Sequence, residues 1–175
     1  DIILRSLDIS NAKDILILGE TVGDKLDQTS KEMIAHGNKL AGILGGQVKM
    51  VLLGDNLGTV PQQAISFGAS QVYAVTDPLL MNFQIDAYLE SLMGVIEENR
   101  PRVMLFGKTF IGTEVGPRLA FKLDAGLIQD SIEIGIDEAS GNLIGVRPVF
   151  GGNCMAKVVC SGEPSLAIIR AKTIE

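Results

Sequence analysis

Four short apolar runs recur along the first two-thirds of the chain, and each ends in glycine or at a turn. The runs span residues 14–20, 47–54, 71–76 and 103–106. Continuous apolar runs of this length are typical of parallel strands, because helices cover both faces of a parallel sheet and leave no polar side. The pattern therefore predicts four buried parallel strands.

Segments with helical spacing separate these runs. Thr29 and Glu32 form a T-x-x-E capping box, which predicts that a helix begins there and continues through residues 33–44 until Gly45 ends it. Further helices are predicted over 60–67, along the apolar stripe of Ile85, Leu89, Leu92 and Ile96, and from about Thr113 to Gly126. Strands that alternate with helices form right-handed βαβ units, so we expect an α/β fold with helices on both faces of the sheet.

The pattern changes after Gly126, where no further helix is predicted. Strand-like segments cover residues 128–137, 143–150, 154–161 and 165–171, and clusters of turn-forming residues join them. Strands joined directly by turns pair antiparallel. The sequence therefore predicts mostly antiparallel C-terminal strands, attached to the α/β body without an intervening linker.

The charge balance excludes several classes of partner. The chain has 175 residues, of which 46% are apolar, and its formal net charge is −6. This length and apolar content fit one domain with a substantial core. An excess of acidic residues has the wrong sign for binding nucleic acid. No window resembles a membrane span or a secretory leader, so we expect a soluble, cytoplasmic protein without membrane insertion.

The histidine and cysteine content is too low for most metal sites and catalytic triads. His36 is the only histidine, and it lies in a predicted helix without a nucleophile elbow nearby. Cys154 and Cys160 have a spacing that fits neither a zinc pair nor a redox motif. We therefore expect no metal site and no catalytic residue, and two free, buried thiols on one face of a strand.

One loop could carry chemistry at the carboxyl ends of the strands, where parallel sheets bind ligands. Gly107, Lys108 and Thr109 follow a strand and precede a helix, as in a P-loop. The P-loop pattern needs an earlier glycine, but residue 102 is arginine. These three residues are therefore weak candidates for phosphate binding, and strand closure is the competing interpretation.

Two arginines are candidates for structural or interface roles. Arg118 lies in the first turns of a helix, where the macrodipole disfavours a cation, so we expect Glu114 to be its partner. Arg147 is either a surface charge or a buried arginine at a subunit contact. In the second case it would bind the turn at residues 151–153 or a carboxylate such as Asp130.

The motifs after Gly107 resemble the N-terminal domain of the electron transfer flavoprotein alpha subunit, and the likeness covers about residues 14–173. The matching positions are Pro117-Arg118-Leu119-Ala120, Leu123-Asp124-Ala125-Gly126 with Asp130, Arg147-Pro148 with Gly152-Asn153, and Arg170. Together with Gly151, the residues Arg118, Asp130, Arg147, Gly152 and Asn153 are therefore candidates for structural roles or for the subunit interface.

This resemblance implies a Rossmann-like sheet of the adenine nucleotide alpha hydrolase type, in an alpha/beta heterodimer. It implies a beta subunit as partner, and flavin dehydrogenases of the acyl-CoA dehydrogenase type as electron donors. In the family the FAD lies mainly in a second, C-terminal alpha domain, so we expect no cofactor in this chain. Residues 14–175 would form the N-terminal domain, and residues 1–13 a leader or linker from a possible N-terminal extension.

Two functions remain open from the sequence. The first is a scaffold that binds the beta subunit of an electron carrier and has no autonomous catalytic activity. The alternative is a stand-alone adenine-nucleotide-binding module, because the fold type is shared with stress proteins that hold ATP at the strand ends. The antiparallel C-terminal strands favour the first.

Overall fold

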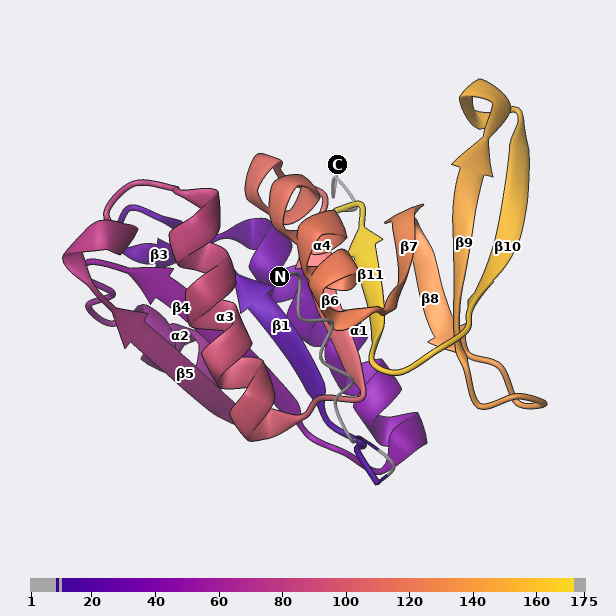
Figure 1. Ribbon diagram of the computed structural model, residues 1–175, viewed down its shortest axis with the longest axis horizontal. Helices are drawn as coiled ribbons and strands as arrows, with labels where there is room; N and C mark the ends of the chain where they lie inside the picture. Colours follow the sequence, from indigo (N-terminus) through magenta and orange to yellow (C-terminus); the bar gives the residue numbers. More distant parts are fainter. Residues whose placement is uncertain (1–8, 10, 172–175) are drawn as a thin grey trace.

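The computed structural model describes residues 9 and 11–171, which form a six-stranded parallel sheet with helices on both faces (Figure 1). The strand order is β5-β4-β1-β6-β11-β7. The strands are β1 (Ile15–Gly19), β4 (Val48–Gly54), β5 (Gln71–Thr76), β6 (Val103–Gly107), β7 (Gly126–Ser131) and β11 (Ser165–Ile169). All neighbours in this order pair parallel, so the expected α/β fold is confirmed.

Two apolar layers hold the helices on the sheet. The helices are α1 (Gln28–Leu44), α2 (Val60–Ser66), α3 (Ile85–Asn99) and α4 (Phe110–Leu123). Met33 of α1 packs in one cluster with Ile17 of β1. Leu92 of α3 and Leu119 of α4 pack in a second cluster, with Leu16 of β1. Because alternate residues of β1 point to opposite faces, α1 and α2 cover one face while α3 and α4 cover the other.

Two helices begin earlier than their sequence patterns predict. The predicted capping box at Thr29 is wrong, because Asp27 is the N-cap of α1 and accepts a hydrogen bond of 2.8 Å from Thr29 N. Asp27 has an extended backbone and a short acceptor side chain, which is what the N-cap position requires. In α4 the N-cap is Thr109, so the helix begins at Phe110 rather than near Thr113. The left-handed C-cap at Gly45 is confirmed.

The C-terminal third contributes to two sheets. Strands β8 (Glu133–Ile136), β9 (Leu143–Val149) and β10 (Cys154–Cys160) form an antiparallel sheet in the order β10-β9-β8, which confirms the expected antiparallel part. The segment predicted as one strand over 128–137 is two strands, and its first half is β7 of the parallel sheet. The last strand, β11, inserts between β6 and β7, and all its residues are buried there. A short ribbon of β2 (Thr21–Val22) and β3 (Lys25–Leu26) follows β1.

Part of the antiparallel sheet extends as a two-stranded ribbon. Strand β8 pairs with β9 only over Leu143–Val146, whereas β10 pairs with β9 along its full length. Residues 147–156 therefore continue as a hairpin that projects from the body, with a 3-10 turn at Phe150–Gly152 as its tip (Figure 1). We call residues 147–156 the arm.

The arm explains one error in the sequence analysis. Cys160 is buried and free, as expected, but Cys154 is free and exposed, because it lies in the arm beyond the cover of the body. The expected leader or linker over residues 1–13 lies largely outside the described residues. Of this segment residues 9 and 11–13 are described, and Ile9 is buried. Within the described residues, no helix is long and apolar enough to cross a bilayer.

Candidate functional site

One end of the sheet, called its carboxyl edge, is formed by the carboxyl ends of β1, β6, β11 and β7. The chain leaves β1 toward β4 and β5 on one side, and it places β6, β11 and β7 on the other. In open α/β sheets, ligands bind where the strand order reverses in this way. Here that point lies between β1 and β6, and polar residues of the following loops meet there and along the neighbouring strand ends.

A hydrogen bond between Glu20 and Thr109 joins the loops that follow β1 and β6. The Thr109 hydroxyl donates a hydrogen bond of 2.5 Å to Glu20 Oε1, and Glu20 N donates to Ser30 Oγ at 2.8 Å. Burial raises the pKa of Glu20, although the bond from Thr109 acts in the opposite direction. The loops after β1 and β6 are thus tied to each other and to α1.

Asp130 organises the next strand ends. Arg170 binds its carboxylate through two hydrogen bonds. Nε donates to Oδ1, and Nη2 donates to Oδ2 at 2.7 Å. Lys108 Nζ donates to Oδ1 at 2.5 Å. The hydrogen bonds from Arg170, with those from Lys108, hold the pKa of Asp130 well below its usual range. Asp130 has a φ of 63°, a left-handed conformation that is uncommon for residues other than glycine.

The predicted phosphate loop is fully engaged in contacts of its own. Lys108 is paired with Asp130, and the Thr109 oxygen accepts from Gly112 N at 3.0 Å, which removes a free donor from the α4 terminus. A Cβ on Gly107 would lie 2.4 Å from Thr29 Cγ2, so close packing accounts for this glycine. These contacts favour strand closure, the competing interpretation, and phosphate binding by Gly107, Lys108 and Thr109 stays a prediction.

The other sequence-predicted residues lie apart from this edge. Arg118 Nη1 lies 2.9 Å from Glu114 Oε2, so the expected partner is present, and the pair is solvent-exposed on α4. Gly151 and Gly152 lie at the tip of the arm with φ values of 67° and 93°, and Asn153 follows them as an exposed residue.

Arg147 departs from its expected pairing. Asp130 is occupied by Lys108 and Arg170, and Arg147 Nε is buried without a hydrogen-bond partner among the described residues. Arg147 lies in β9 opposite Ala156, and it makes no bond to the turn at residues 151–153. The prediction of a bond to Asp130 or to that turn is therefore wrong, because the turn lies at the far end of the arm and Asp130 has nearer cations.

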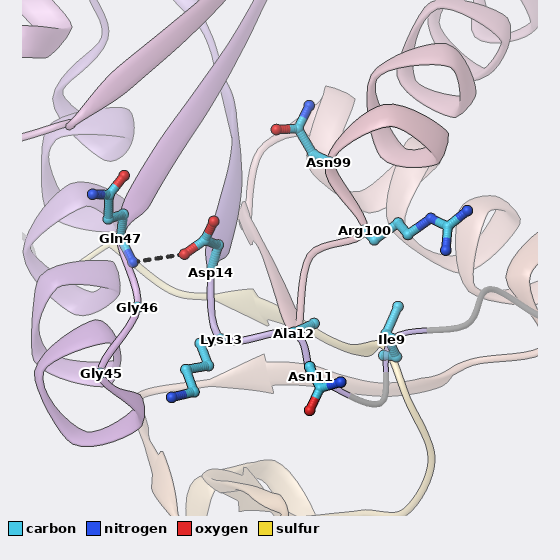
Figure 2. Close-up of a pocket in the computed structure, with 10 residues that line it drawn as sticks. All are labelled: Ile9, Asn11, Ala12, Lys13, Asp14, Gly45, Gly46, Gln47, Asn99 and Arg100. Atoms are coloured by element: carbon cyan, nitrogen blue, oxygen red, sulfur yellow. Dashed lines mark hydrogen bonds between the residues drawn. The ribbon is translucent and has the colours of Figure 1, made fainter.

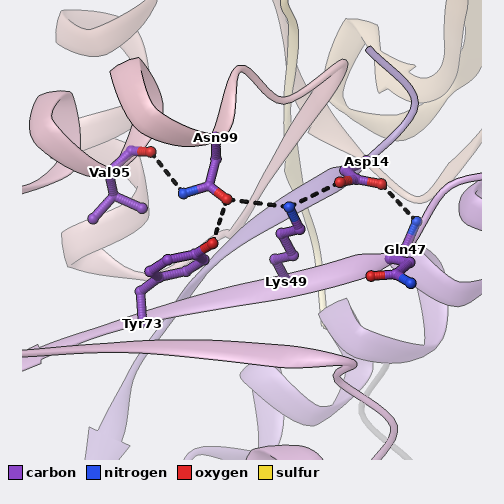
Figure 3. Close-up of polar contacts among 6 residues, drawn as sticks. All are labelled: Asp14, Gln47, Lys49, Tyr73, Val95 and Asn99. Atoms are coloured by element: carbon purple, nitrogen blue, oxygen red, sulfur yellow. Dashed lines mark hydrogen bonds and ion pairs between the residues drawn. The ribbon is translucent and has the colours of Figure 1, made fainter.

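A second polar cluster lies at the opposite end of the strands, near their amino ends, and it was not predicted from the sequence. Lys49 Nζ bridges Asp14 Oδ2 at 2.9 Å and Asn99 Oδ1 at 3.2 Å, and the Tyr73 hydroxyl donates to the same Asn99 oxygen (Figure 3). Burial acts to raise the pKa of Asp14, but bonds from Lys49 and Gln47 N outweigh it and lower the pKa. The charged residues near the ends of the apolar runs are the signal from which the sequence could have predicted this cluster.

A hollow of about 610 Å³ adjoins this cluster (Figure 2). Asp14, Gln47, Asn99 and Arg100 line it, together with residues near Ile9. Gln47 N donates to Asp14 Oδ1 at 2.9 Å, so these polar groups satisfy one another and tie β1, β4 and α3 together. None of the sequence-predicted site residues lines this hollow.

The described residues hold no cluster of side chains typical of a metal centre. Within them, no three His, Cys, Asp or Glu side chains come together as a metal site. The polar clusters at both edges are internally paired, as structural contacts are. What distinguishes the surface is the arm, with its exposed apolar side chains and its unpaired arginine.

Comparison with known proteins gives a consistent family. Residues 15–175 match the Electron transfer flavoprotein domain. The chain is 38% identical to "Electron transfer flavoprotein subunit alpha" of Thermoanaerobacterium thermosaccharolyticum over 93% of the chain and 49% of that protein. It is 34% identical to the protein of the same name from Clostridium acetobutylicum, again over 93% of the chain and 49% of the relative.

A further relative has a different name. The chain is 31% identical to "Acryloyl-CoA reductase electron transfer subunit beta" of Anaerotignum propionicum, over 95% of the chain and 52% of that protein. The chain thus spans about half the length of the curated relatives it matches. The family match extends through the parallel sheet and the arm alike, and the chain belongs to the electron transfer flavoprotein domain family.

Proposed function

We propose that this chain is the scaffold domain on the alpha side of an electron transfer flavoprotein. Its role is to hold the beta subunit, so that the assembled protein carries electrons from flavin dehydrogenases of the acyl-CoA dehydrogenase type to an acceptor. Membership of the family and the names of the relatives support electron transfer. The internally paired strand ends give no support to the alternative, a stand-alone nucleotide-binding module.

The arm is the observation that carries this proposal. An isolated two-stranded ribbon is marginally stable in water. Phe150 at its tip is 81% exposed and Met155 is 58% exposed, while Val159 follows in the same strand at 50%. Aromatic residues and methionine are enriched where subunits meet. A projecting ribbon with these side chains is suited to binding another subunit.

The cofactor and the chemistry belong elsewhere in this proposal. FAD is held mainly by parts of the electron carrier outside this chain, because the donors at the strand ends are already used within the chain. The chain has no autonomous catalytic activity, and it works in the cytoplasm. Its parallel sheet supplies a rigid body from which the arm reaches the partner.

The test is binding of the chain to its cognate electron transfer flavoprotein beta subunit. We expect a complex with one copy of each by size-exclusion chromatography with light scattering. Replacing Phe150 and Met155 together by serine should abolish it. Phe121→Ser is the matched control, because Phe121 is 63% exposed on α4 of the body. Absence of a complex, or a complex insensitive to the arm variant, would contradict the proposal.

A separate measurement tests the cofactor. The desalted chain should show no visible flavin absorbance, whereas one flavin per chain would show that this domain holds FAD itself.

A further inference from the structure

The arm and the strands that bear it have an unusual charge for this protein. Residues 143–160 include Arg147 and Lys157 but no aspartate or glutamate, whereas the whole chain has a formal net charge of −6. A cationic, apolar ribbon on an acidic body favours a partner surface that is apolar and acidic.

Arg147 is the one arm residue with a buried, unpaired donor. Its Nε is inaccessible to solvent and lacks an acceptor among the described residues. Leaving a charged donor buried and unpaired is costly, so such a group is expected to have a partner in the assembled protein.

The nearby carboxylates of the chain do not serve Arg147. Asp130 binds Lys108 and Arg170, and Asp137 accepts hydrogen bonds from Ser140. Glu133 is opposite Val146, whose side chain points to the other face of β9 from that of Arg147. No carboxylate of the described part of the chain therefore accepts from Arg147 Nε, and the rest of this partly buried side chain is open to a partner.

The position of Arg147 indicates where such a partner would lie. Leu143, Gly145 and Arg147 share one face of β9, because side chains alternate along a strand. Leu143 and Gly145 are buried against the body, and Gly145 packs on Ser131 and Ile128 of β7. Arg147 is the next residue on this face, at the start of the arm. A subunit that covers the arm at Arg147 would pack on the same face of β9 that β7 covers at Gly145.

We propose that Arg147 is the polar anchor of the subunit interface and binds a carboxylate of the beta subunit. The receiving groove is apolar where it takes Phe150 and acidic where it meets Arg147. This inference rests on the proposed function. A guanidinium can bind a carboxylate through two parallel hydrogen bonds, which would fix the arm in one orientation.

The test is calorimetric titration of the cognate beta subunit with the parent chain and three variants. Arg147→Met should weaken binding about 30-fold or more, because a carboxylate in the partner loses its buried cation. Arg147→Lys should weaken it about tenfold, since a point charge does not replace a planar fork. Lys157→Met is the matched control, because this exposed cation should change affinity by no more than about fivefold.

A second readout separates an anchor from a structural residue. The urea midpoint of the free chain should not fall in either Arg147 variant, because no acceptor in the described chain is lost and Arg147→Met removes a buried, unpaired donor. If the parent binds and Arg147→Met binds within about threefold of it, the anchor is disproved and the scaffold function stands. If the parent does not bind, both proposals fail. If Arg147→Met instead abolishes self-association of the free chain, the acceptor lies in a second copy and the inference is wrong.

Discussion

Thr109 joins the ends of two neighbouring strands, because its hydroxyl donates to Glu20 Oε1 across 2.5 Å. The Thr109 hydroxyl oxygen also accepts a hydrogen bond from Gly112 N at 3.0 Å and so caps α4. One side chain therefore closes the sheet between β1 and β6 and also fixes the first turn of the helix that follows. The position at which a nucleotide-binding fold would expose donors is used here for internal support.

Replacing Thr109 by valine should destabilise the chain by about 1–2 kcal/mol. The variant loses the cap of α4 and leaves the Glu20 carboxylate without a donor. Urea unfolding followed by circular dichroism measures the change. Thr113→Val is the control, since Thr113 is an exposed residue of the same helix and its replacement should cost no more than about 0.5 kcal/mol. Equal losses in the two variants would show that the Thr109 cap does not stabilise α4.

Glu20→Gln should make the stability of the chain less sensitive to pH. Burial raises the pKa of Glu20, so the folded chain holds the proton more tightly than the unfolded chain. This stabilising contribution is complete below the unfolded pKa and is lost as pH rises through the raised folded pKa. Glutamine keeps the acceptor for Thr109 and cannot ionise. The variant should therefore gain stability relative to the parent between about pH 4 and pH 7.

Urea midpoints of parent and variant at these two pH values measure the difference. Glu90→Gln, at an exposed position of α3, controls for the change in net charge. A Glu20→Gln variant whose difference from the parent is the same at both pH values would contradict the assigned burial effect.

Asp130→Asn should destabilise the chain at neutral pH and have little effect in strong acid. The bonds from Arg170 and Lys108 depress the pKa of Asp130, so its contribution is present above the unfolded pKa and is lost as pH falls through the folded pKa. We expect a loss of about 1 kcal/mol at pH 7, reduced by high salt because Arg170 and Lys108 are partly exposed. Asparagine tolerates the positive φ, so the change reports on charge.

Chemical denaturation at neutral and acidic pH checks this difference. Asp124→Asn is the control, because Asp124 also has a positive φ of 51° but no ion pair is found for it in the described chain. A salt-insensitive loss in Asp130→Asn would point to backbone strain instead of the ion pairs.

The sequence predicts the sheet well because its signals are local. Each buried strand is a continuous apolar run, and the stripe at Ile85, Leu89, Leu92 and Ile96 is long enough to define α3. Helix starts are less certain, because Asp27 and Thr29 are both good N-caps by residue type, and Asp27 is the one that caps α1. The insertion of β11 between β6 and β7 depends on long-range pairing that no local pattern encodes.

The pairing of charges is also non-local. The sequence offers Asp130 as one of several partners for Arg147, but Asp130 binds Lys108, 22 residues away, and Arg170, 40 residues away. Asp130 also has a left-handed φ, which no turn motif in the sequence indicates. The free arm follows from β8 being three residues shorter than β9, a difference that alternation patterns do not resolve.

Gly145→Ala should loosen the attachment of β9 and the arm to the body. A Cβ at this position would lie 2.8 Å from Ser131 Oγ and 2.9 Å from Ile128 Cγ2, and both side chains are buried. Alanine usually stabilises a strand relative to glycine by restricting the unfolded chain, by about 0.4–1 kcal/mol. Overpacking of about 1–3 kcal/mol should outweigh that gain, so we expect a lower urea midpoint.

Gly135→Ala is the matched control in the neighbouring strand β8, because its Cβ would lie 3.7 Å from Ile144, an ordinary contact. The control should be neutral or slightly stabilising, and opposite signs for the two variants are the expected result. A Gly145→Ala variant as stable as Gly135→Ala would show that the antiparallel sheet can move away from β7 at little cost, and that the body does not hold the arm in place.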